Sequence, residues 1–361
     1  SLRMADRYDD ALAELDHAES LAVASNRTLE LARIHHLRGN IYFPLGKIDQ
    51  CLAEHQAALN FATQTDSTED QARALGGIGD AYYMAGRMSS AHEHLDRCVE
   101  LCRAHGLERI EAAYLPMRGT TYMYRLRFTE ALDDCWASNE IATRSGHPRG
   151  EIISRNISCW TLLDRHDFVR SQQHARIALE LIEKIGARRF VPLFNDILAR
   201  IWLHVGDRAG AVKLLEESLA ISRETGITFL GPFVLGAIAL AADESTRRRD
   251  ALNEGEAILS RGCVAHNVFW FYRDAIEVSL AEGAWDQADA YTAALDTYFR
   301  EEPMAWADFI VARGRALAQF GRGPRAGALQ QVRQLRDQAA RLNMMAELIR
   351  LDAALESASQ G

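Results

Sequence analysis

Proline is scarce in this sequence, with 7 residues among 361. Because proline disrupts the interior of a helix, its scarcity favours long uninterrupted helices. Long hydrophobic runs are missing too: the longest, roughly Phe229 to Ala242, contains Gly231-Pro232 and stops at Asp243-Glu244. It is too short to cross a bilayer and is typical of a buried helix. We therefore expect no membrane partner, and no signal peptide is visible.

A surplus of basic residues is also missing. Lys and Arg number 41 against 50 Asp and Glu, which gives a formal net charge of −9. A nucleic-acid-binding surface is normally basic, so we expect no nucleic-acid partner. The six cysteines form no C-x-x-C pair, and a chain of this length folds without disulfides. We therefore expect a reduced, cytoplasmic protein.

Motifs of catalysis are not found. The segment Gly39 to Lys47 contains a Gly and a Gly-Lys, but six residues separate its glycines and Ile48 follows the lysine. A phosphate-binding loop needs four residues there and then Ser or Thr for magnesium. No G-x-S-x-G is present, and no motif places a base beside a nucleophile. We expect no catalytic residue, no cofactor and no enzyme activity.

One cluster has the spacing of metal ligands. His94, Cys98, Cys102 and His105 share one helical face by their spacing of four, four and three. Cys98 also falls in a column of small residues described below, where cysteine acts as a small hydrophobe. We favour the packing role and predict no metal.

The dominant feature is a repeat of 40 residues. Small residues recur at this spacing, and the series continues at intervals of 37 and 38: Ala11, Cys51, Ala91, Ala131, Ser171, Ala211, Ala251, Ala288 and Ala326. A second column follows seven residues later: Ala18, Ala58, Cys98, Ser138, Ala178 and Ser218. A third consists of glycines: Gly106, Gly146, Gly186 and Gly226. Small side chains allow two helices to approach closely, and a glycine just past a helix end adopts the left-handed conformation.

The columns imply an all-α solenoid of antiparallel helix pairs. We predict a half-pair over residues 1–26, eight helix pairs over about 27–342 and a closing helix over about 344–358. The whole of 1–361 is then one repeat domain, which grows in one dimension. The first residue is Ser and the first pair lacks its first helix, so we expect a fragment of a longer protein.

The repeat resembles the tetratricopeptide (TPR) repeat. The pattern Ile78-Gly79-x-x-Tyr82 followed by Ala91 and Leu95 matches the L-G-x2-Y and A-x3-F positions of that family. The resemblance implies a right-handed superhelix with a concave groove lined by the first helix of each pair. The period of 40 exceeds the usual 34, so longer helices are expected.

A second resemblance concerns the C-terminal part. The segment Gly262 to Asp274, with Trp306-Ala307-Asp308-Phe309 and Ala312 to Leu317, is similar to the tails of large bacterial signalling proteins. Those proteins carry a class III adenylate/guanylate cyclase domain, an AAA-type ATPase domain and a TPR-like tail. The resemblance covers roughly residues 186–357 by motif and implies that the chain is a regulatory tail rather than a cyclase.

Polar and aromatic residues on the predicted groove face are the candidate binding residues, since aromatics and Arg dominate interaction hot spots. The candidates are Arg33, Asn40, Arg73, Asp80, Tyr83, Asn156, Trp160, Arg200, His266, Trp270, Tyr272 and Arg273. His36, Thr120, Asp196 and His204 share that face.

Two further segments stand out. The aromatic run Phe269 to Tyr272 cannot face one core across a helix, so we expect about two of its members in the core and at least one at the groove or an interface. It also makes a homodimer one alternative. Asn267 is expected to cap a helix start. The run Arg247-Arg248-Arg249 is expected in a solvated loop between helices.

Two functions follow, from different classes. The first is a regulatory interaction module that binds a protein or peptide partner, or the missing domains of its own chain. The alternative is a sensor that binds a small molecule in the concave groove.

Overall fold

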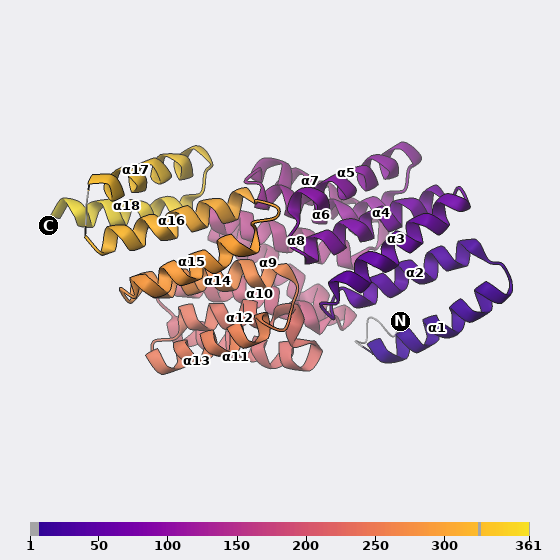
Figure 1. The fold of residues 1–361 in the computed structure, drawn as a ribbon, viewed down its shortest axis with the longest axis horizontal. Helices are drawn as coiled ribbons and strands as arrows, with labels where there is room; N and C mark the ends of the chain where they lie inside the picture. The colour runs from indigo at the N-terminus through magenta and orange to yellow at the C-terminus, as the bar shows by residue number, and fades with distance from the viewer. Residues whose placement is uncertain (1–6, 324–325, 361) are drawn as a thin grey trace.

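The structure is a computed structural model that describes residues 7–323 and 326–360, and within these ranges it is helical with no β-strand (Figure 1). The expected all-α helical solenoid is confirmed. In chain order the elements are α1 (Tyr8–Ala24), α2 (Thr28–Tyr42), α3 (Ile48–Gln64), α4 (Thr68–Met84), α5 (Met88–His105), α6 (Glu108–Tyr124), α7 (Phe128–Ser145), α8 (Pro148–Asp164), α9 (Phe168–Ile185), η2 (Arg188–Phe190), α10 (Val191–His204), α11 (Arg208–Thr225), α12 (Ile227–Ala241), α13 (Ser245–Leu259), α14 (Ala265–Ala281), α15 (Trp285–Tyr298), α16 (Ala305–Gly321), α17 (Ala326–Arg341) and α18 (Met345–Gln360).

Each helix packs on the next along the chain. The described helices form an opening α1, eight pairs from α2/α3 to α16/α17, and a last helix α18. The even-numbered helices are the first helices of these pairs. Residues 1–6 of the expected opening half-pair lie outside the described residues. The N-terminal and C-terminal helices lie at opposite ends of the solenoid (Figure 1).

The turns follow the glycine columns. Gly106, Gly146 and Gly186 each follow a second helix with φ of 67°, 65° and 70°, so the predicted left-handed conformation is confirmed for these three. The fourth member of the column, Gly226, has φ 129° and ψ 100° instead. A Cβ atom at the first three positions would meet nothing within 4 Å. Glycine is therefore needed there for its backbone conformation and not for space.

The small-residue column lies where helices approach most closely. Its members from Cys51 to Ala288 are fully buried. The last one differs from the prediction: Ala326 is exposed and Ala328, 40 residues after Ala288, is buried in its place. The repeat that is three residues short therefore lies between Ala251 and Ala288, and the spacing of 40 residues resumes after Ala288.

Residues of the second column also bond to the first helix of their own pair. The Cys98 thiol donates to the Ala72 carbonyl at 3.1 Å, and the Ser138 hydroxyl donates to the Ala112 carbonyl at 2.8 Å. Cys98 thus has the packing role that its column predicts, while His105 on the same helix is exposed. Among the residues that the structure describes, no three His, Cys, Asp or Glu side chains are grouped to hold a metal ion.

The superhelix closes on itself after five pairs. Helix α14 contacts α4, α16 contacts α6, and α18 contacts α8. Polar bonds across this closure include Glu302, whose carboxylate accepts from the backbone N–H groups of Ser89 and Ser90 at 2.6 and 3.0 Å. The inner face is therefore not the long open groove that the repeat implies, because first helices from one turn cover those of the next.

Two local predictions are wrong. The run Arg247 to Arg249 lies inside α13 and not in a loop. Asn267 does not cap α14, whose N-cap is Val264. Its side chain instead accepts from the Phe233 N–H at 3.1 Å and donates to the carbonyl of Thr228 at 3.1 Å. Pro232 lies within α12 and has no N–H to satisfy that carbonyl, so Asn267 repairs the interrupted helix from outside.

The aromatic run is more buried than expected. Phe269, Trp270 and Phe271 are all buried, and Tyr272 is half-buried beside Tyr291. Helix α14 accommodates three of them because it packs on its neighbours α12, α15 and α16 and also across the closure on α4. The run lies inside the molecule, so it gives no support to a homodimer.

Candidate functional site

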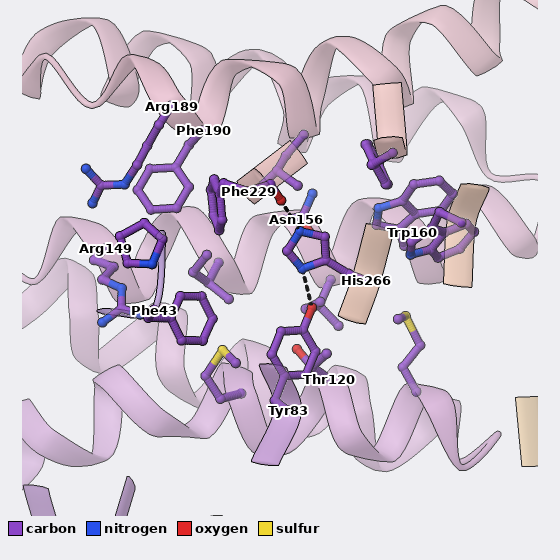
Figure 2. Close-up of a pocket in the computed structure, with 18 of the residues that line it drawn as sticks. Phe43, Tyr83, Thr120, Arg149, Asn156, Trp160, Arg189, Phe190, Phe229 and His266 are labelled. Atoms are coloured by element: carbon purple, nitrogen blue, oxygen red, sulfur yellow. Dashed lines mark hydrogen bonds between the residues drawn. The ribbon is translucent and has the colours of Figure 1, made fainter. Parts of the chain in front are cut away.

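A cavity lies inside the closed turn of the solenoid (Figure 2). Its lining comes from the inner helices α2, α4, α6, α8, α10, α12 and α14 and from η2. The lining residues are Asn40, Phe43, Pro44, Tyr83, Met117, Thr120, Met123, Tyr124, Arg149, Ile153, Asn156, Ile157, Trp160, Arg189, Phe190, Leu193, Phe229, Phe233, His266 and Trp270. The space open to the centres of water-sized molecules is about 80 Å³. One such centre needs about 10–15 Å³, so the cavity has room for several waters or one small molecule.

One end of the cavity is an aromatic wall. The rings of Trp160 and Trp270 are stacked with their centroids 3.9 Å apart. The Trp270 indole N–H donates to the Tyr124 hydroxyl at 3.0 Å, which fixes the ring. Arg200 lies behind the pair with its guanidinium 5.2 Å from the Trp160 centroid, a cation–π distance. The wall is therefore rigid and joins α6, α8, α10 and α14.

His266 bridges two turns of the solenoid near the middle of the cavity (Figure 2). Its Nε2 lies 2.5 Å from the Phe229 carbonyl oxygen, and its Nδ1 lies 3.1 Å from the Tyr83 hydroxyl. A carbonyl only accepts, so Nε2 carries the proton and the neutral ring accepts from Tyr83 at Nδ1. Burial lowers the pKa of His266 to about 4, which keeps the ring neutral at pH 7. The bridge uses the Phe229 carbonyl of the proline-interrupted helix α12.

Asn156 supplies the cavity with a donor that no protein group uses. Its side chain is 7% exposed, and its Nδ2 has no hydrogen-bond partner among the described residues. Two other polar side chains of the lining are engaged: Asn40 bonds to His36 at 2.8 Å, and the Thr120 hydroxyl donates to the Pro116 carbonyl at 2.8 Å. A buried amide left unpaired costs about 1–3 kcal/mol. Such a group is expected where a ligand completes the bonding.

Two arginines lie at the other end of the cavity (Figure 2). Arg149 is the second residue of α8, and its side chain is 28% exposed, so this end reaches solvent. Its guanidinium lies 3.8 Å from the carboxylate of Asp80, a buried residue outside the lining. Arg189 belongs to η2, is buried and lies 4.7 Å from the centroid of Phe190. The cavity thus has a cationic mouth and an aromatic end.

The structure brings six of the twelve candidate residues together. Those that line the cavity are Asn40, Tyr83, Asn156, Trp160, His266 and Trp270. The other six lie elsewhere: Arg33, Arg73, Asp80, Arg200, Tyr272 and Arg273. Arg33 is exposed and pairs with Asp70, and Arg73 is half-buried and pairs with Glu69.

Arg200 and Arg273 belong to a buried ionic network instead of the cavity. Arg200 donates to both carboxylate oxygens of Asp274 at 3.0 and 2.6 Å and to Asp196 at 2.9 Å. Arg273 lies 3.5 Å from Asp274 and 3.6 Å from Glu347 of α18. Burial raises the pKa of Asp196 to about 6. The network fixes α18 to the inner helices, so its arginines are matched by protein carboxylates.

Sequence reasoning missed the two arginines at the mouth. Arg149 lies at the very start of α8 and Arg189 lies in a 3₁₀ turn, both outside the helix centres considered for the groove. A signal was present: Arg109, Arg149 and Arg189 are spaced by 40 residues and are equivalent in three successive pairs. Two of the three, Arg149 and Arg189, line the cavity, whereas Arg109 is exposed.

The residues that the structure describes include no helix that is long and apolar enough to span a membrane.

Comparison with known proteins gives matches to repeat families. A family model for the tetratricopeptide repeat matches residues 30–104, and another of the same description matches residues 196–225. The outer dynein arm-docking complex subunit 4 of Danio rerio is 32% identical over 108 residues. These are 30% of this chain and 22% of that protein, so the chain spans about a fifth of that relative's length.

Solved structures extend the likeness to the whole chain. A Rap protein complexed with competence and sporulation factor is similar over 100% of this chain and 98% of its own, with a TM-score of 0.64 and 12% identity. The apo form of RapI is similar over 84% of this chain and 99% of its own, with a TM-score of 0.50 and 12% identity. At these identities the likeness is one of fold.

Proposed function

We propose that the chain, which is a tetratricopeptide-like repeat array, is a non-catalytic regulatory interaction module that binds a small ligand in its interior cavity. Arrays of this kind offer extended surfaces for binding. The observation that carries the proposal is the buried, unpaired amide nitrogen of Asn156 in a cavity of about 80 Å³. A buried donor without a partner is rare in a folded protein and suits a site that a ligand completes.

The shape of the cavity favours a small molecule over a long peptide. The closure of α14 on α4 covers the inner face, so an extended chain has no continuous groove to occupy. Ligand sites are mostly apolar with a few placed polar groups, and this lining has eight aromatic residues of Phe, Tyr or Trp type and few polar ones. Of the two functions that the sequence suggests, the geometry therefore favours the sensor as the primary event.

The regulatory part of the proposal rests on where the cavity lies. Its walls come from helices early in the array and from α12 and α14, which meet only because the solenoid closes. A ligand that contacts both the early helices and α12 or α14 binds the closed form more tightly than a more open form. It therefore stabilises the closed form by the difference between these two binding free energies. The partner that reads this change is a protein, either separate or part of the same longer chain.

Two comparisons support this view without identifying the partner. The Rap protein of the same fold was solved as a complex with a factor, so this architecture accommodates a bound partner in that protein. The similarity of residues 186–357 to the tails of cyclase–ATPase signalling proteins supports a parent protein of that kind. In that case the array would regulate nucleotide chemistry elsewhere in the chain, in the cytoplasm.

The test is native mass spectrometry of the freshly purified chain, beside a variant in which the cavity is blocked. The chain has a mass of 40.3 kDa, and a ligand adds up to a few hundred daltons. Ile153→Phe places a larger side chain in the lining, and Ile153→Leu is the control of equal volume. For the wild type and the Leu variant we expect a bound ligand in the mass spectrum, or a rise in melting temperature when fractions of a cell extract are added. For the Phe variant we expect neither. An equal response from the Phe variant, or no response from any of the three, overturns the proposal.

A further inference from the structure

The closure of the solenoid has a fixed register. Helix α14 contacts α4, α16 contacts α6 and α18 contacts α8, so each first helix meets the one whose number is lower by ten. The described helices stop at α18. In the same register, α10 is the position on which the next first helix would lie.

A groove is found at that position. It is lined by Leu203 and His204 of α10, by neighbouring residues of α8, α9, α11, α12 and α14, and by Ala346 and Arg350 of α18. The space open to the centres of water-sized molecules is about 290 Å³, against about 80 Å³ in the interior cavity. The two sites share no lining residue, and His204 is exposed, so the groove opens to solvent.

The groove has apolar walls and an apolar edge. Four half-buried side chains of the walls are apolar: Leu163, Phe168, Leu203 and Leu240. On α18, Ile349 follows the lining residue Ala346 by three positions and therefore shares its face. Ile349 is 47% exposed, and Met345, one turn before it, is 37% exposed. The terminal repeat of a solenoid normally presents a polar outer face, so this apolar edge favours a further layer of protein over water.

One acid in the groove is unpaired. Each of the four arginines in the lining is paired with a carboxylate: Arg200 with Asp274 at 2.6 Å, Arg208 with Asp243 at 2.6 Å, Arg273 with Glu347 at 3.6 Å and Arg350 with Glu347 at 3.0 Å. The carboxylate of Asp164, also in the lining, makes no hydrogen bond or ion pair with another described residue. Burial raises the pKa of Asp164 to about 6, although the charge of Arg273 opposes the shift, so the carboxylate is ionised at pH 7.

We propose that this groove binds an amphipathic helix of a partner protein, in the position of the next first helix of the solenoid. Apolar side chains at helical spacing cover Ile349 and enter the groove between α18 and α10. A Lys or Arg on the flank of that apolar stripe pairs with Asp164. The partner helix continues an interface that the molecule already makes three times across its closure.

The groove also depends on the closure. Its walls come from α8 and α10 on one side and from α18 on the other, and α18 meets α8 only across the closure. A partner helix that binds here therefore distinguishes the closed solenoid from a more open one. The inference goes beyond the proposed function, since it does not depend on a ligand in the cavity.

The experiment measures the binding of three synthetic helical peptides to the full chain by fluorescence anisotropy. Each has 16 residues, the length of α18, and the same stripe of leucines. One position on the flank of the stripe is Lys, Gln or Glu. We expect the Lys peptide to bind about fivefold more tightly than the Gln peptide, the upper range for a solvent-accessible ion pair, and the Glu peptide more weakly than both. A fourth peptide with serines in place of the leucines should not bind.

Two variants assign the binding to the groove. Ile349→Glu places a charge on the apolar edge and should weaken the binding of all three peptides about tenfold, because the charge would be buried under the leucine stripe. Leu37→Glu is the matched control, since Leu37 is 45% exposed on α2 and lies outside the groove. Asp164→Asn should remove the preference for Lys over Gln and leave the binding of the Gln peptide unchanged, which also shows that this variant folds.

The outcomes are distinct. Equal affinities for the Lys and Glu peptides, binding that Ile349→Glu leaves unchanged, or no binding of any peptide overturns the proposal. A second copy of the chain is the alternative occupant, and sedimentation equilibrium of the chain alone tests it. A dimer that Ile349→Glu abolishes and Leu37→Glu retains overturns the partner assignment, whereas a monomer supports it. Ile153 lies outside the groove, so Ile153→Phe should bind the peptides like the wild type, which separates a failure here from a failure of the cavity ligand.

Discussion

The hydroxyl of Tyr83 in α4 lies 3.1 Å from Nδ1 of His266 in α14, although 183 positions separate the two residues. The same imidazole donates to the Phe229 carbonyl of α12. One neutral histidine thus joins the first turn of the solenoid to the second, at a carbonyl in the proline-interrupted helix. The bond between Tyr83 and His266 joins residues far apart in the sequence, so it forms only because the array closes.

Removal of the Tyr83 hydroxyl should weaken the closure. Tyr83→Phe leaves the buried Nδ1 of His266 without a donor, which costs about 1–3 kcal/mol in unfolding free energy. Urea unfolding followed by tryptophan fluorescence measures the loss. Tyr82→Phe, one residue along the same helix and half-buried, is the control. A loss no greater than that of Tyr82→Phe would show that the bond does not stabilise the fold.

Acidification should destabilise the protein through His266. The folded pKa is about 4, below the ordinary 6.5, so the unfolded chain binds more protons between these values. Stability is therefore retained above pH 6.5 and lost as the pH falls toward 4, by about 2 kcal/mol between pH 7 and pH 5. His266→Gln keeps a donor and an acceptor without titrating. The difference between wild type and His266→Gln isolates this residue from His55 and His92, whose pKa values burial lowers to about 3 and 4. Parallel pH profiles for the two proteins would refute the assignment.

Asn156→Leu should separate stability from binding. The Asn156 amide has no partner, so an apolar side chain of similar volume removes a cost and leaves the unfolding free energy unchanged or raised by about 1 kcal/mol. Ligand-induced thermal shifts should fall at the same time. Asn40→Leu is the matched control, since it breaks the bond to His36 and should destabilise the chain. A clear loss of stability in Asn156→Leu would place the residue in the structural framework and not in the site.

Gly86 should tolerate a side chain less well than Gly206. Both have positive φ, 79° and 88°, so alanine costs about 1–2 kcal/mol of backbone strain at either position. A Cβ atom at Gly86 would in addition lie 2.7 Å from Cε1 of Tyr298, across the closure, whereas Gly206 has nothing within 4 Å. We expect Gly86→Ala to be the more destabilising in urea unfolding. The excess should vanish when Tyr298 is replaced by alanine; an excess that persists would locate the strain elsewhere.

Much of the architecture follows from local patterns. Glycines at 40-residue intervals specify the turns, because a left-handed residue ends a helix wherever it stands. The small residues of the first column from Ala11 to Ala288 are buried because helices of a pair need them at the same point in every repeat. Local departures do not follow from such patterns: Asn267 is expected to cap a helix, but the carbonyl freed by Pro232, that of Thr228, lies in another helix, 39 residues earlier in the chain.

The sequence by itself determined the helix pairs, their period and the face of each first helix that turns inward, since periodicity and backbone conformation are properties of short segments. It also contained the recurring Arg109, Arg149 and Arg189. Only the tertiary structure decided that the inner face closes, which of its charges are neutralised and which surround a cavity. Arg200 and Arg149 both lie on inner helices, yet Arg200 is paired with Asp274 across the interior while Arg149 stands at the mouth. Pairings of that kind depend on the pitch of the whole superhelix, a sum of small rotations that no single repeat specifies.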